Sequence, residues 1–230
     1  MAVFVFDCGG TLMEYAGIPA SWSNFYPAGF RAVADALCPA CTEADIAGSA
    51  AQLAAFNPRV TGRETEYSPA ELFAACTAHW PAPAAPEKAA AVFFQSLRLT
   101  PEIYPDSIPT LRRLRDAGHK TAILTDLPSG MPDALFRADI APLLPHIDLY
   151  VSSGTCGFRK PNPTGLQRIA DYFSVDPHAW AAAFSAPTAA ERRWISPPFL
   201  AKTASPLLQS IKKITSIVKK SVRQCYRKQG

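Results

Sequence analysis

Apolar residues recur along the chain in two patterns, and the order of these patterns predicts the architecture. Continuous runs rich in β-branched and aromatic residues occur at Ala2–Phe6, His119–Thr125 and Ile147–Ser152. Such short runs are typical of buried parallel strands. Helical spacing of apolar residues follows at positions 108–118, 131–144 and 163–173. This alternation predicts an α/β fold with a doubly wound parallel sheet and right-handed crossovers.

A long helical block interrupts the alternation after the first strand. From Pro27 to Leu99 the sequence is rich in Ala and Leu with helical spacing, broken by proline-containing turns such as Pro81–Pro86. It contains no convincing strand pattern. We therefore predict an α/β core of residues 1–15 and 100–184, with an inserted helical domain of residues 16–99.

The pattern degrades after about Asp176. Ala179–Phe184 is a poor strand and Ser185–Ser205 has no period, so we expect poor order there and a parallel sheet that lacks its fourth strand. An amphipathic helix is predicted over residues 205–228, because Ser-Pro opens a run with apolar residues on one face and lysines around the rest. Residues 185–230 are thus predicted to form an atypical basic tail with a C-terminal helix.

Charge divides along the chain in the same way. Arg192–Gly230 contains ten Lys or Arg and no Asp or Glu, so this segment carries +10 and the rest of the chain −6. The overall charge of +4 is therefore no indication that the folded body binds nucleic acid. The basic amphipathic tail is the candidate for contact with a protein or an anionic membrane. The oligomeric state is not encoded in these patterns.

Composition indicates a globular chain of the cytoplasm. Of the 230 residues, 48% are hydrophobic, which is enough to fill a core. No apolar stretch approaches the roughly 18 residues of a membrane span, and the start of the chain lacks the features of a signal peptide. The six cysteines form no disulfide framework. Only Cys38 and Cys41 have ligand-like spacing, so a zinc site or a redox pair is the alternative to ordinary thiols.

Candidate chemical groups follow the predicted strands. Asp7 comes directly after the first strand, Thr125 ends the second, and Lys160 lies in the loop after the third. Ligands of a doubly wound sheet bind at the carboxyl ends of the strands, so these residues are expected to meet. Gly9 and Gly10 allow backbone N–H groups to approach an anion closely. The combination predicts a phosphoryl site in which Lys160 offsets negative charge.

These motifs resemble those of the haloacid dehalogenase (HAD) superfamily of aspartate-nucleophile hydrolases. Val3–Leu12, with the sequence VFVFDCGGTL, resembles the first motif, Thr125 the second, and Lys160–Pro163 the third. The helical block resembles the small α-helical cap of that family. The similarity covers about residues 2–178 and implies a HAD-like, Rossmannoid core that carries a cap.

The resemblance implies a role for each matching position. Asp7 would be the catalytic nucleophile that forms a covalent aspartyl intermediate. Mg²⁺ would be bound partly by Asp7 and the carbonyl of Gly9. Asp126 would line the mouth of the site, and Lys160 would orient the nucleophile. The phosphoryl group would be held by Cys8, Gly9, Gly10, Thr125 and Lys160.

Two features depart from the family pattern. Typical phosphatases of the family have an acid two residues after the nucleophile, where this chain has Gly9, and such proton transfer is commonly worth roughly 10²–10⁴-fold in rate. The family also expects a later strand that ends in Gly-Asp, whereas Phe184–Thr188 has no carboxylate. The nearby Asp171 and Asp176 fit a helix surface and a turn better than a metal site.

The predicted function is Mg²⁺-dependent hydrolysis of a small phosphorylated metabolite by a HAD-type phosphatase, with the cap setting specificity. The alternative is a catalytically impaired HAD-fold chain that acts as a binding or interaction module. A dehalogenase is a third hypothesis, since that branch does not rely on Mg²⁺ but expects other residues beside its nucleophile. The coincident loss of motif, strand and acidic residues after about Asp176 suggests a shifted reading frame or a fusion.

Overall fold

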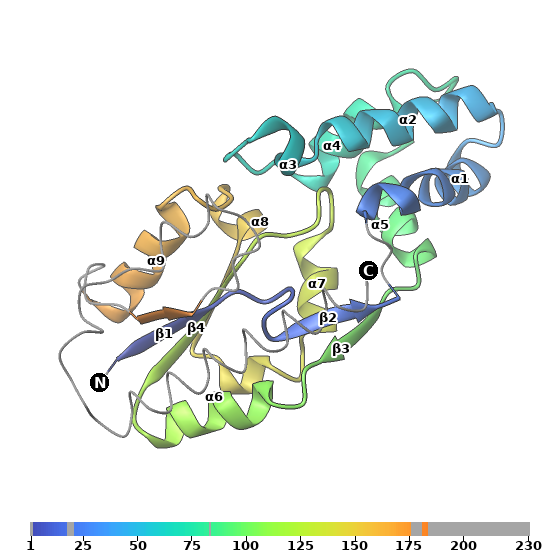
Figure 1. Cartoon of the computed structure of the whole chain (residues 1–230). Helices are drawn as coiled ribbons and strands as arrows, with labels where there is room; N and C mark the ends of the chain where they lie inside the picture. Colours follow the sequence, from blue (N-terminus) through green and yellow to red (C-terminus); the bar gives the residue numbers. More distant parts are fainter. Residues whose placement is uncertain (1, 18–20, 83, 176–180, 184–230) are drawn as a thin grey trace.

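A four-stranded parallel sheet forms the centre of the protein (Figure 1). The computed structural model describes residues 2–17, 21–82, 84–175 and 181–183. The strands run in the order β5-β4-β1-β6, and every neighbouring pair is parallel. Their bounds are β1 (Val3–Phe6), β4 (Lys120–Thr125), β5 (Leu149–Ser152) and β6 (Ala181–Ala183). The predicted doubly wound parallel sheet is confirmed.

Helices cover both faces of this sheet. Successive side chains of β1 point to opposite faces, and all of them are apolar, so each face needs a layer of helices to bury them. Phe4 and Phe6 pack in one apolar cluster with Leu111 and Phe136, whereas Val5 packs in a second cluster with residues of α9. Figure 1 shows α6 and α9 on opposite sides of the sheet. The core helices are α6 (Ser107–Asp116), α7 (Asp133–Asp139), the short α8 (Ser153–Cys156) and α9 (Thr164–Phe173), with a 3-10 turn, η2, at Leu144–His146.

A two-stranded antiparallel sheet joins the core to the helical block, and the sequence did not predict it. β2 (Met13–Ala16) pairs with β3 (Thr100–Ile103). The hydroxyl of Ser107 donates to the carbonyl of Leu12 at 2.8 Å, which fixes the returning chain beside the loop that follows β1. The chain therefore leaves the core through β2 and returns to it through β3, and these two strands are paired.

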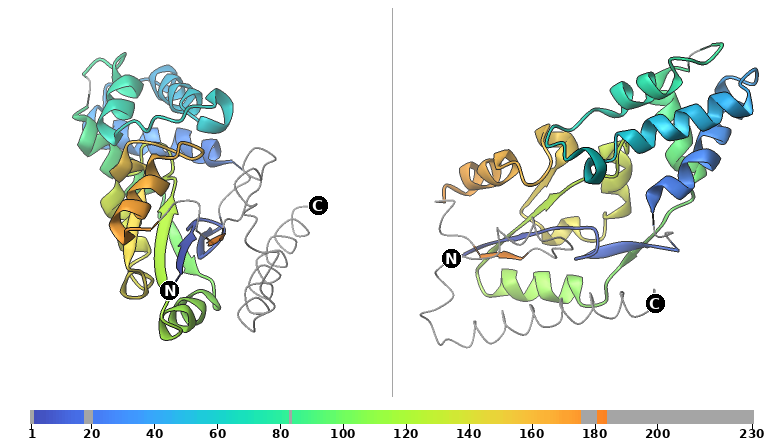
Figure 2. Two further views of the ribbon diagram at one scale, coloured as in Figure 1. Left: turned by 90° about the vertical axis from the view of Figure 1, so that its left-hand side faces the viewer. Right: turned by 45° about the horizontal axis from the view of Figure 1, so that its top comes forward.

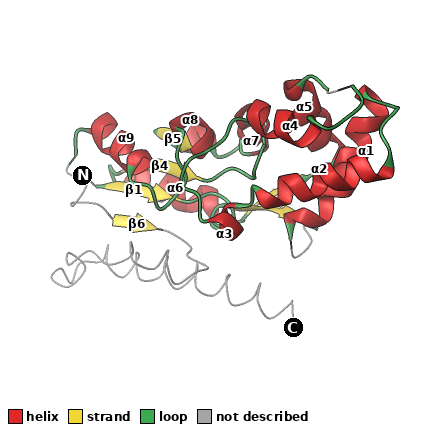
Figure 3. Cartoon of the chain, turned by 90° about the horizontal axis from the view of Figure 1, so that it is seen from above, coloured by secondary structure: helices red, strands yellow, loops and turns green. Residues whose placement is uncertain are grey.

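The helices between β2 and β3 pack around a cluster of buried aromatic rings. Phe30 contacts Phe73 and Phe93 with ring centroids 5.6 and 5.1 Å apart, and all three side chains are fully buried. Both views of Figure 2 show these helices as one group beyond the carboxyl ends of β1 and β4, and Figure 3 shows the same grouping from above. We call Trp22–Ser96 the helical insertion. Its elements are η1 (Trp22–Phe25), α1 (Tyr26–Leu37), α2 (Glu43–Ala55), α3 (Pro58–Thr61), α4 (Pro69–Thr77) and α5 (Pro86–Ser96).

Local sequence explains where these helices start. Thr42 and Ser68 each cap a helix, and each forms a reciprocal capping box with an acidic residue three positions later. Cys38 and Cys41 lie in the turn between α1 and α2, and both are free thiols. The helical nature of the block is as predicted, while its exact limits as a domain stay a prediction.

The expectation that the sheet lacks its fourth strand was wrong. β6 pairs in parallel with β1, and Phe4 lies opposite Ala181. Alanine has low strand propensity, but an open edge of a buried strand offers hydrogen bonds that override such a preference. The predicted tail helix of residues 205–228, the segment 185–205 and Asp176 lie outside the described residues. Within the described ranges, no helix is long and apolar enough to cross a bilayer.

Candidate active site

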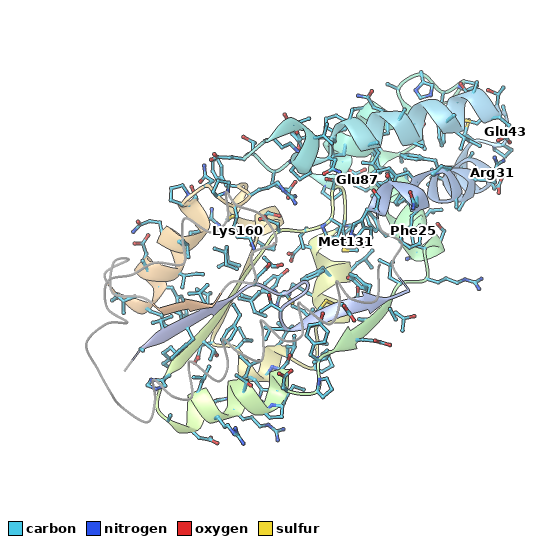
Figure 4. The ribbon with its side chains drawn as sticks, viewed as in Figure 1. Phe25, Arg31, Glu43, Glu87, Met131 and Lys160 are labelled. Carbon is cyan, nitrogen blue, oxygen red and sulfur yellow. The ribbon has the colours of Figure 1, made fainter. Side chains whose placement is uncertain are left out.

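The first and third sequence motifs meet at the carboxyl end of β1. Asp7 follows this strand directly, and its Oδ1 lies 2.9 Å from Nζ of Lys160. The backbone N–H of Cys8 donates to the same oxygen at 2.8 Å. The side chains of Asp7 and Lys160 are 18% and 21% exposed, so the ion pair is largely shielded from water and yet reachable. Lys160 lies between α8 and α9, on the side of the core that faces the helical insertion (Figure 4).

The loop after Asp7 is a tight turn built on one carbonyl. The carbonyl of Cys8 accepts hydrogen bonds from the amides of Thr11, Leu12 and Met13, at 3.1, 2.8 and 3.2 Å. Gly10 has a φ of +72°, a left-handed conformation that favours glycine. The turn therefore curls back immediately after the predicted nucleophile.

Gly9 stands in open space within this turn. A Cβ placed on Gly9 would meet no heavy atom within 4 Å. The backbone of Gly9 is also outside the left-handed region, unlike that of Gly10. The absence of an acid at this position is therefore not enforced by packing or by backbone strain.

The second motif lies beside the first on the neighbouring strand. Thr125 ends β4 and is buried, opposite Ser152 of β5 in the sheet register. The next residue, Asp126, accepts a hydrogen bond at 3.1 Å from the backbone N–H of Lys160. Burial raises the pKa of the Asp126 carboxyl, while the positive charges of Lys160 and Arg159 act in the opposite direction. The structure thus brings Asp7, Thr125 and Lys160 to one end of the sheet, and their catalytic roles stay predictions.

Cys8 has the properties of a structural thiol. It is fully buried, and this burial, with a smaller effect from the charge of Asp7, raises its pKa well above the usual range for a thiol. A thiol that does not ionise at neutral pH is a poor nucleophile. The thiol of Cys8 therefore supplies no charge to the site, and its backbone N–H serves to hold Asp7.

Sequence reasoning missed an acidic residue of the insertion that reaches the same end of the core. Glu66 forms ion pairs with Arg63 and Arg159, and it accepts a hydrogen bond from Ser153 at 2.6 Å. The adjacent pair Arg159-Lys160 was the available signal, since an arginine beside a predicted site lysine needs a counter-charge. Its partner was not predictable, because Glu66 lies 93 positions away in the chain.

The described residues offer few ligands for a metal ion. No group of three or more His, Cys, Asp or Glu side chains that could hold one occurs in the part of the chain that the structure describes. Asp171 lies on α9, is exposed, and accepts from Gln167 at 2.9 Å, as expected for a helix surface. The carboxylate of Asp7 and the carbonyl of Gly9 fit an Mg²⁺ ion that is shared with a substrate phosphate, because Mg²⁺ often binds through one or two carboxylates plus phosphate oxygens. These two ligands by themselves do not complete the coordination of such an ion.

Comparison with known proteins identifies the fold and the family. The fold is similar to the crystal structure of a HAD phosphatase from Thermococcus onnurineus, with 18% identity, a TM-score of 0.50, and coverage of 81% of this chain and 78% of that one. It is also similar to the L-2-haloacid dehalogenase from Xanthobacter autotrophicus, with 20% identity, a TM-score of 0.43, and coverage of 91% and 86%. No curated protein matches the sequence. The family model of haloacid dehalogenase-like hydrolases matches residues 1–182. The protein therefore belongs to the family of haloacid dehalogenase-like hydrolases.

Proposed function

We propose that this protein is a phosphatase that uses Asp7 as its nucleophile and acts on a small phosphorylated metabolite. The observation that carries the proposal is the ion pair between Asp7 and Lys160 at the carboxyl end of β1, with Nζ and Oδ1 2.9 Å apart. Ligands of doubly wound sheets bind at this end. A shielded carboxylate beside a cation is suited to attack a phosphate, because the cation offsets repulsion between the two negative groups.

The orientation of Asp7 defines the first step. Oδ1 is held by Nζ of Lys160 and by the N–H of Cys8, so attack falls to Oδ2. In this step a bond forms between Oδ2 and phosphorus, the bond from phosphorus to the leaving oxygen breaks, and the leaving group departs with its electron pair. Water then attacks the phosphorus of the aspartyl phosphate, which releases inorganic phosphate and restores the Asp7 carboxylate.

The surrounding groups would bind the phosphoryl oxygens. The hydroxyl of Thr125 and the backbone N–H of Gly9 are the candidate donors, and Lys160 supplies positive charge. The N–H groups of Cys8 and Gly10 donate to Asp7 and to the carbonyl of Met13, so they would have to exchange these bonds to reach a phosphate. Mg²⁺, held by Asp7 and the carbonyl of Gly9 together with the substrate, would supply further charge neutralisation. With Asp7 and Gly9 as its ligands from the described residues, we expect Mg²⁺ to bind more tightly when phosphate is present.

The glycine at position 9 restricts the substrate. It cannot donate a proton to the leaving oxygen, and a missing acid commonly reduces rate by roughly 10²–10⁴-fold. We therefore propose that the natural substrate has an acidic leaving group, such as an acyl phosphate or an aryl phosphate. Simple alkyl phosphates would turn over slowly.

The same glycine favours a second candidate, which is displacement of halide from a 2-haloacid. Halide leaves without protonation, so this reaction needs no acid at Gly9 and no Mg²⁺. Asp7 would attack the carbon that bears the halogen, the carbon–halogen bond would break, and water would hydrolyse the resulting ester. The two reactions differ in their dependence on Mg²⁺.

The proposal extends to the compartment and the partners of the protein. Free thiols at Cys38 and Cys41 suit the reducing cytoplasm. Contact of the basic tail with a protein or an anionic membrane is a separate proposal about residues 185–230, which lie outside the described ranges.

The decisive assay uses the full chain with p-nitrophenyl phosphate and 2-chloropropionate, each with Mg²⁺ and with EDTA. Phosphate release that requires Mg²⁺ and disappears in Asp7→Asn is the expected result. Chloride release that persists in EDTA would replace the phosphatase by the dehalogenase. Turnover of neither substrate, across a wider panel of acyl and aryl phosphates, would favour a binding module.

A further inference from the structure

A buried cluster of three charges joins the helical insertion to the core. Nη1 of Arg63 lies 3.0 Å from Oε1 of Glu66, and Nη1 of Arg159 is paired with Oε2 of the same carboxylate. The side chains of Arg63, Glu66 and Arg159 are only 10%, 7% and 8% exposed. Two of these residues belong to the insertion and the third to the core loop that carries Lys160.

Backbone hydrogen bonds pair the same two segments. Thr65 and Phe158 form an antiparallel bridge. The N–H of Arg159 donates to the carbonyl of Glu64 at 2.6 Å, and the N–H of Glu66 donates to the carbonyl of Gly157 at 2.9 Å. We call residues 63–67 and 157–162 together the clip.

The clip continues directly into the candidate active site. Arg159 is bonded covalently to Lys160, whose amide donates to Asp126 and whose ammonium reaches Asp7. A shift of Arg159 by an ångström would therefore move Lys160 relative to Asp7. Arg159, which pairs with Glu66, and Lys160, which pairs with Asp7, are therefore adjacent residues in the chain.

Glu66 also reaches the loop of the second motif. Its Oε2 accepts from the hydroxyl of Ser153 at 2.6 Å, and the oxygen of that hydroxyl accepts from the N–H of Leu127 at 2.9 Å. Leu127 follows Asp126 in the chain. One carboxylate from the insertion thus holds both loops that bring residues to the end of the sheet.

Burial makes this cluster sensitive to the loss of any one member. A guanidinium that loses its carboxylate inside the protein keeps its desolvation penalty, so a half-formed cluster is unfavourable. The contacts of Glu66 with Arg159 and Ser153 therefore favour the position of the insertion that the structure shows.

We infer that Glu66 is a positioning residue for Lys160. By holding Arg159 and Ser153 from the insertion, it sets the ammonium of Lys160 against Asp7 only while the insertion is docked on the core. This inference rests on the proposed function in that it takes the pair of Asp7 and Lys160 to be the catalytic one. Its structural part, the control of the loop at residues 157–162 by Glu66, is measurable without turnover.

The primary test compares Glu66→Gln with Glu43→Gln. Glu43 also pairs with an arginine, Arg31, but these side chains are 76% and 49% exposed and lie at the far end of the insertion from Lys160 (Figure 4). Hydrogen exchange followed by mass spectrometry reports on the peptides that cover residues 157–162 and 124–129. We expect exchange in both peptides to accelerate at least about tenfold in Glu66→Gln, since the buried pairing that protects them opens. Exchange in Glu43→Gln should match the wild type.

Kinetics with p-nitrophenyl phosphate provide the second readout. A misplaced catalytic group lowers the rate of the chemical step, and a displacement of about 1 Å can cost about 10²-fold. We expect kcat of Glu66→Gln to fall by about 10-fold to 100-fold with a smaller change in KM. Unchanged exchange in the two peptides, or equal kcat in Glu66→Gln and Glu43→Gln, would overturn the inference.

Two further variants keep the test decisive if Glu66→Gln does not fold. Glu66→Asp retains the charge but is too short to hold Arg159 and Ser153 together, and Arg159→Lys retains the charge but loses the planar fork. The two substitutions are then combined in one protein. If Glu66 acts through Arg159, this double variant should lose no more activity than the more impaired of Glu66→Asp and Arg159→Lys. Fully additive losses would contradict the proposed route. If the wild type hydrolyses no phosphate ester, the proposed function fails while the exchange comparison still decides whether Glu66 controls the loop.

Discussion

The backbone N–H of Lys160 donates to Oδ1 of Asp126 at 3.1 Å, so the residue that follows β4 fixes the loop that delivers a cation to Asp7. The family resemblance implies a position for Asp126 at the mouth of the site. Its observed contact is with the backbone of the lysine. Burial raises the pKa of Asp126, and the bond from Lys160 compensates the carboxylate for part of its lost hydration.

Replacing Asp7 by Asn should abolish hydrolysis while the fold survives. The amide retains an oxygen that accepts from the N–H of Cys8, but it is not a nucleophile. The ion pair between Lys160 and residue 7 is lost, which we expect to lower the free energy of unfolding by about 1 kcal/mol. Turnover and thermal unfolding of the two proteins measure both effects. Activity in Asp7→Asn that equals the wild type would remove this residue from the mechanism.

Replacing Gly9 by Asp should accelerate the hydrolysis of poor leaving groups. The space around Gly9 admits a side chain, and a carboxyl there can protonate the leaving oxygen. We expect a gain of about 10-fold or more in kcat with an alkyl phosphate, and little change with p-nitrophenyl phosphate.

Gly9→Asn is the matched control for this prediction, because it has the same shape and transfers no proton. A similar gain in Gly9→Asn and Gly9→Asp would show that the effect is not acid–base catalysis. No gain in either would mean that another step limits the rate.

The Gly29 position in α1 should reject even one methyl group. A Cβ there would lie 2.4 Å from the ring of Phe93, which is fully buried among other aromatic rings. Overpacking of this kind costs about 1–3 kcal/mol, more than the gain of about 1 kcal/mol from better helix propensity. Gly29→Ala should therefore have a lower free energy of unfolding in urea.

Gly48 in α2 provides the comparison. A Cβ there would meet only the tip of the His79 ring at 3.0 Å, and His79 is exposed, so its side chain can move aside by exchanging its hydrogen bond with the carbonyl of Asp45 for one with water. Gly48→Ala should be neutral or more stable by up to about 1 kcal/mol. Equal losses of stability in Gly29→Ala and Gly48→Ala would refute the argument from ring contact.

The carboxyl of Asp148 should contribute stability that disappears in acid. Burial alone would raise its pKa, but hydrogen bonds from the backbone of Thr121 and from Lys120 outweigh burial and hold the pKa below its usual value. A lowered pKa in the folded state means that the contribution is complete above the unfolded value of about 4 and is lost as pH falls through the folded value.

Urea unfolding of the wild type and Asp148→Asn, from pH 7 to pH 3, measures this contribution. The wild type should be more stable at pH 7, and the difference should shrink below about pH 4. A constant difference across this range would assign the effect to packing rather than to charge.

Strands that are buried on both faces were predictable from the sequence. Short strands, and strands that form only because a neighbouring strand offers an edge, were not. β1 is apolar along its whole length and β4 is apolar at Ala122–Leu124, because both of their faces are covered, and this composition identifies them. β2 and β3 have only four residues each. β3 also contains Pro101 and alternates between exposed and half-buried positions, so its sequence does not have the apolar pattern of a buried strand. β6 forms because β1 offers an edge, which is a property of the fold and not of its three alanines.

The candidate site divides in the same manner. Asp7, Thr125 and Lys160 each follow or end a recognisable strand, so the topology of the sheet alone predicts that they meet. Glu66 belongs to a polar loop of the insertion, and its importance depends on how the insertion docks. Nothing in the residues around it specifies a partner in the core.

The pairing of β1 with β4 sets Val3 opposite Lys120 and Phe6 opposite Ile123, and this long separation in the chain sets the order of events during synthesis. β1 leaves the ribosome early and has no partner until β4 has been made. The helices of the insertion depend on contacts within their own segment, so they can form during this delay and draw the two ends of the core together. An insertion that folds slowly would leave the apolar run Val3–Phe6 uncovered for longer. We therefore expect the aromatic cluster around Phe93, which stabilises the insertion, to reduce aggregation of the nascent chain.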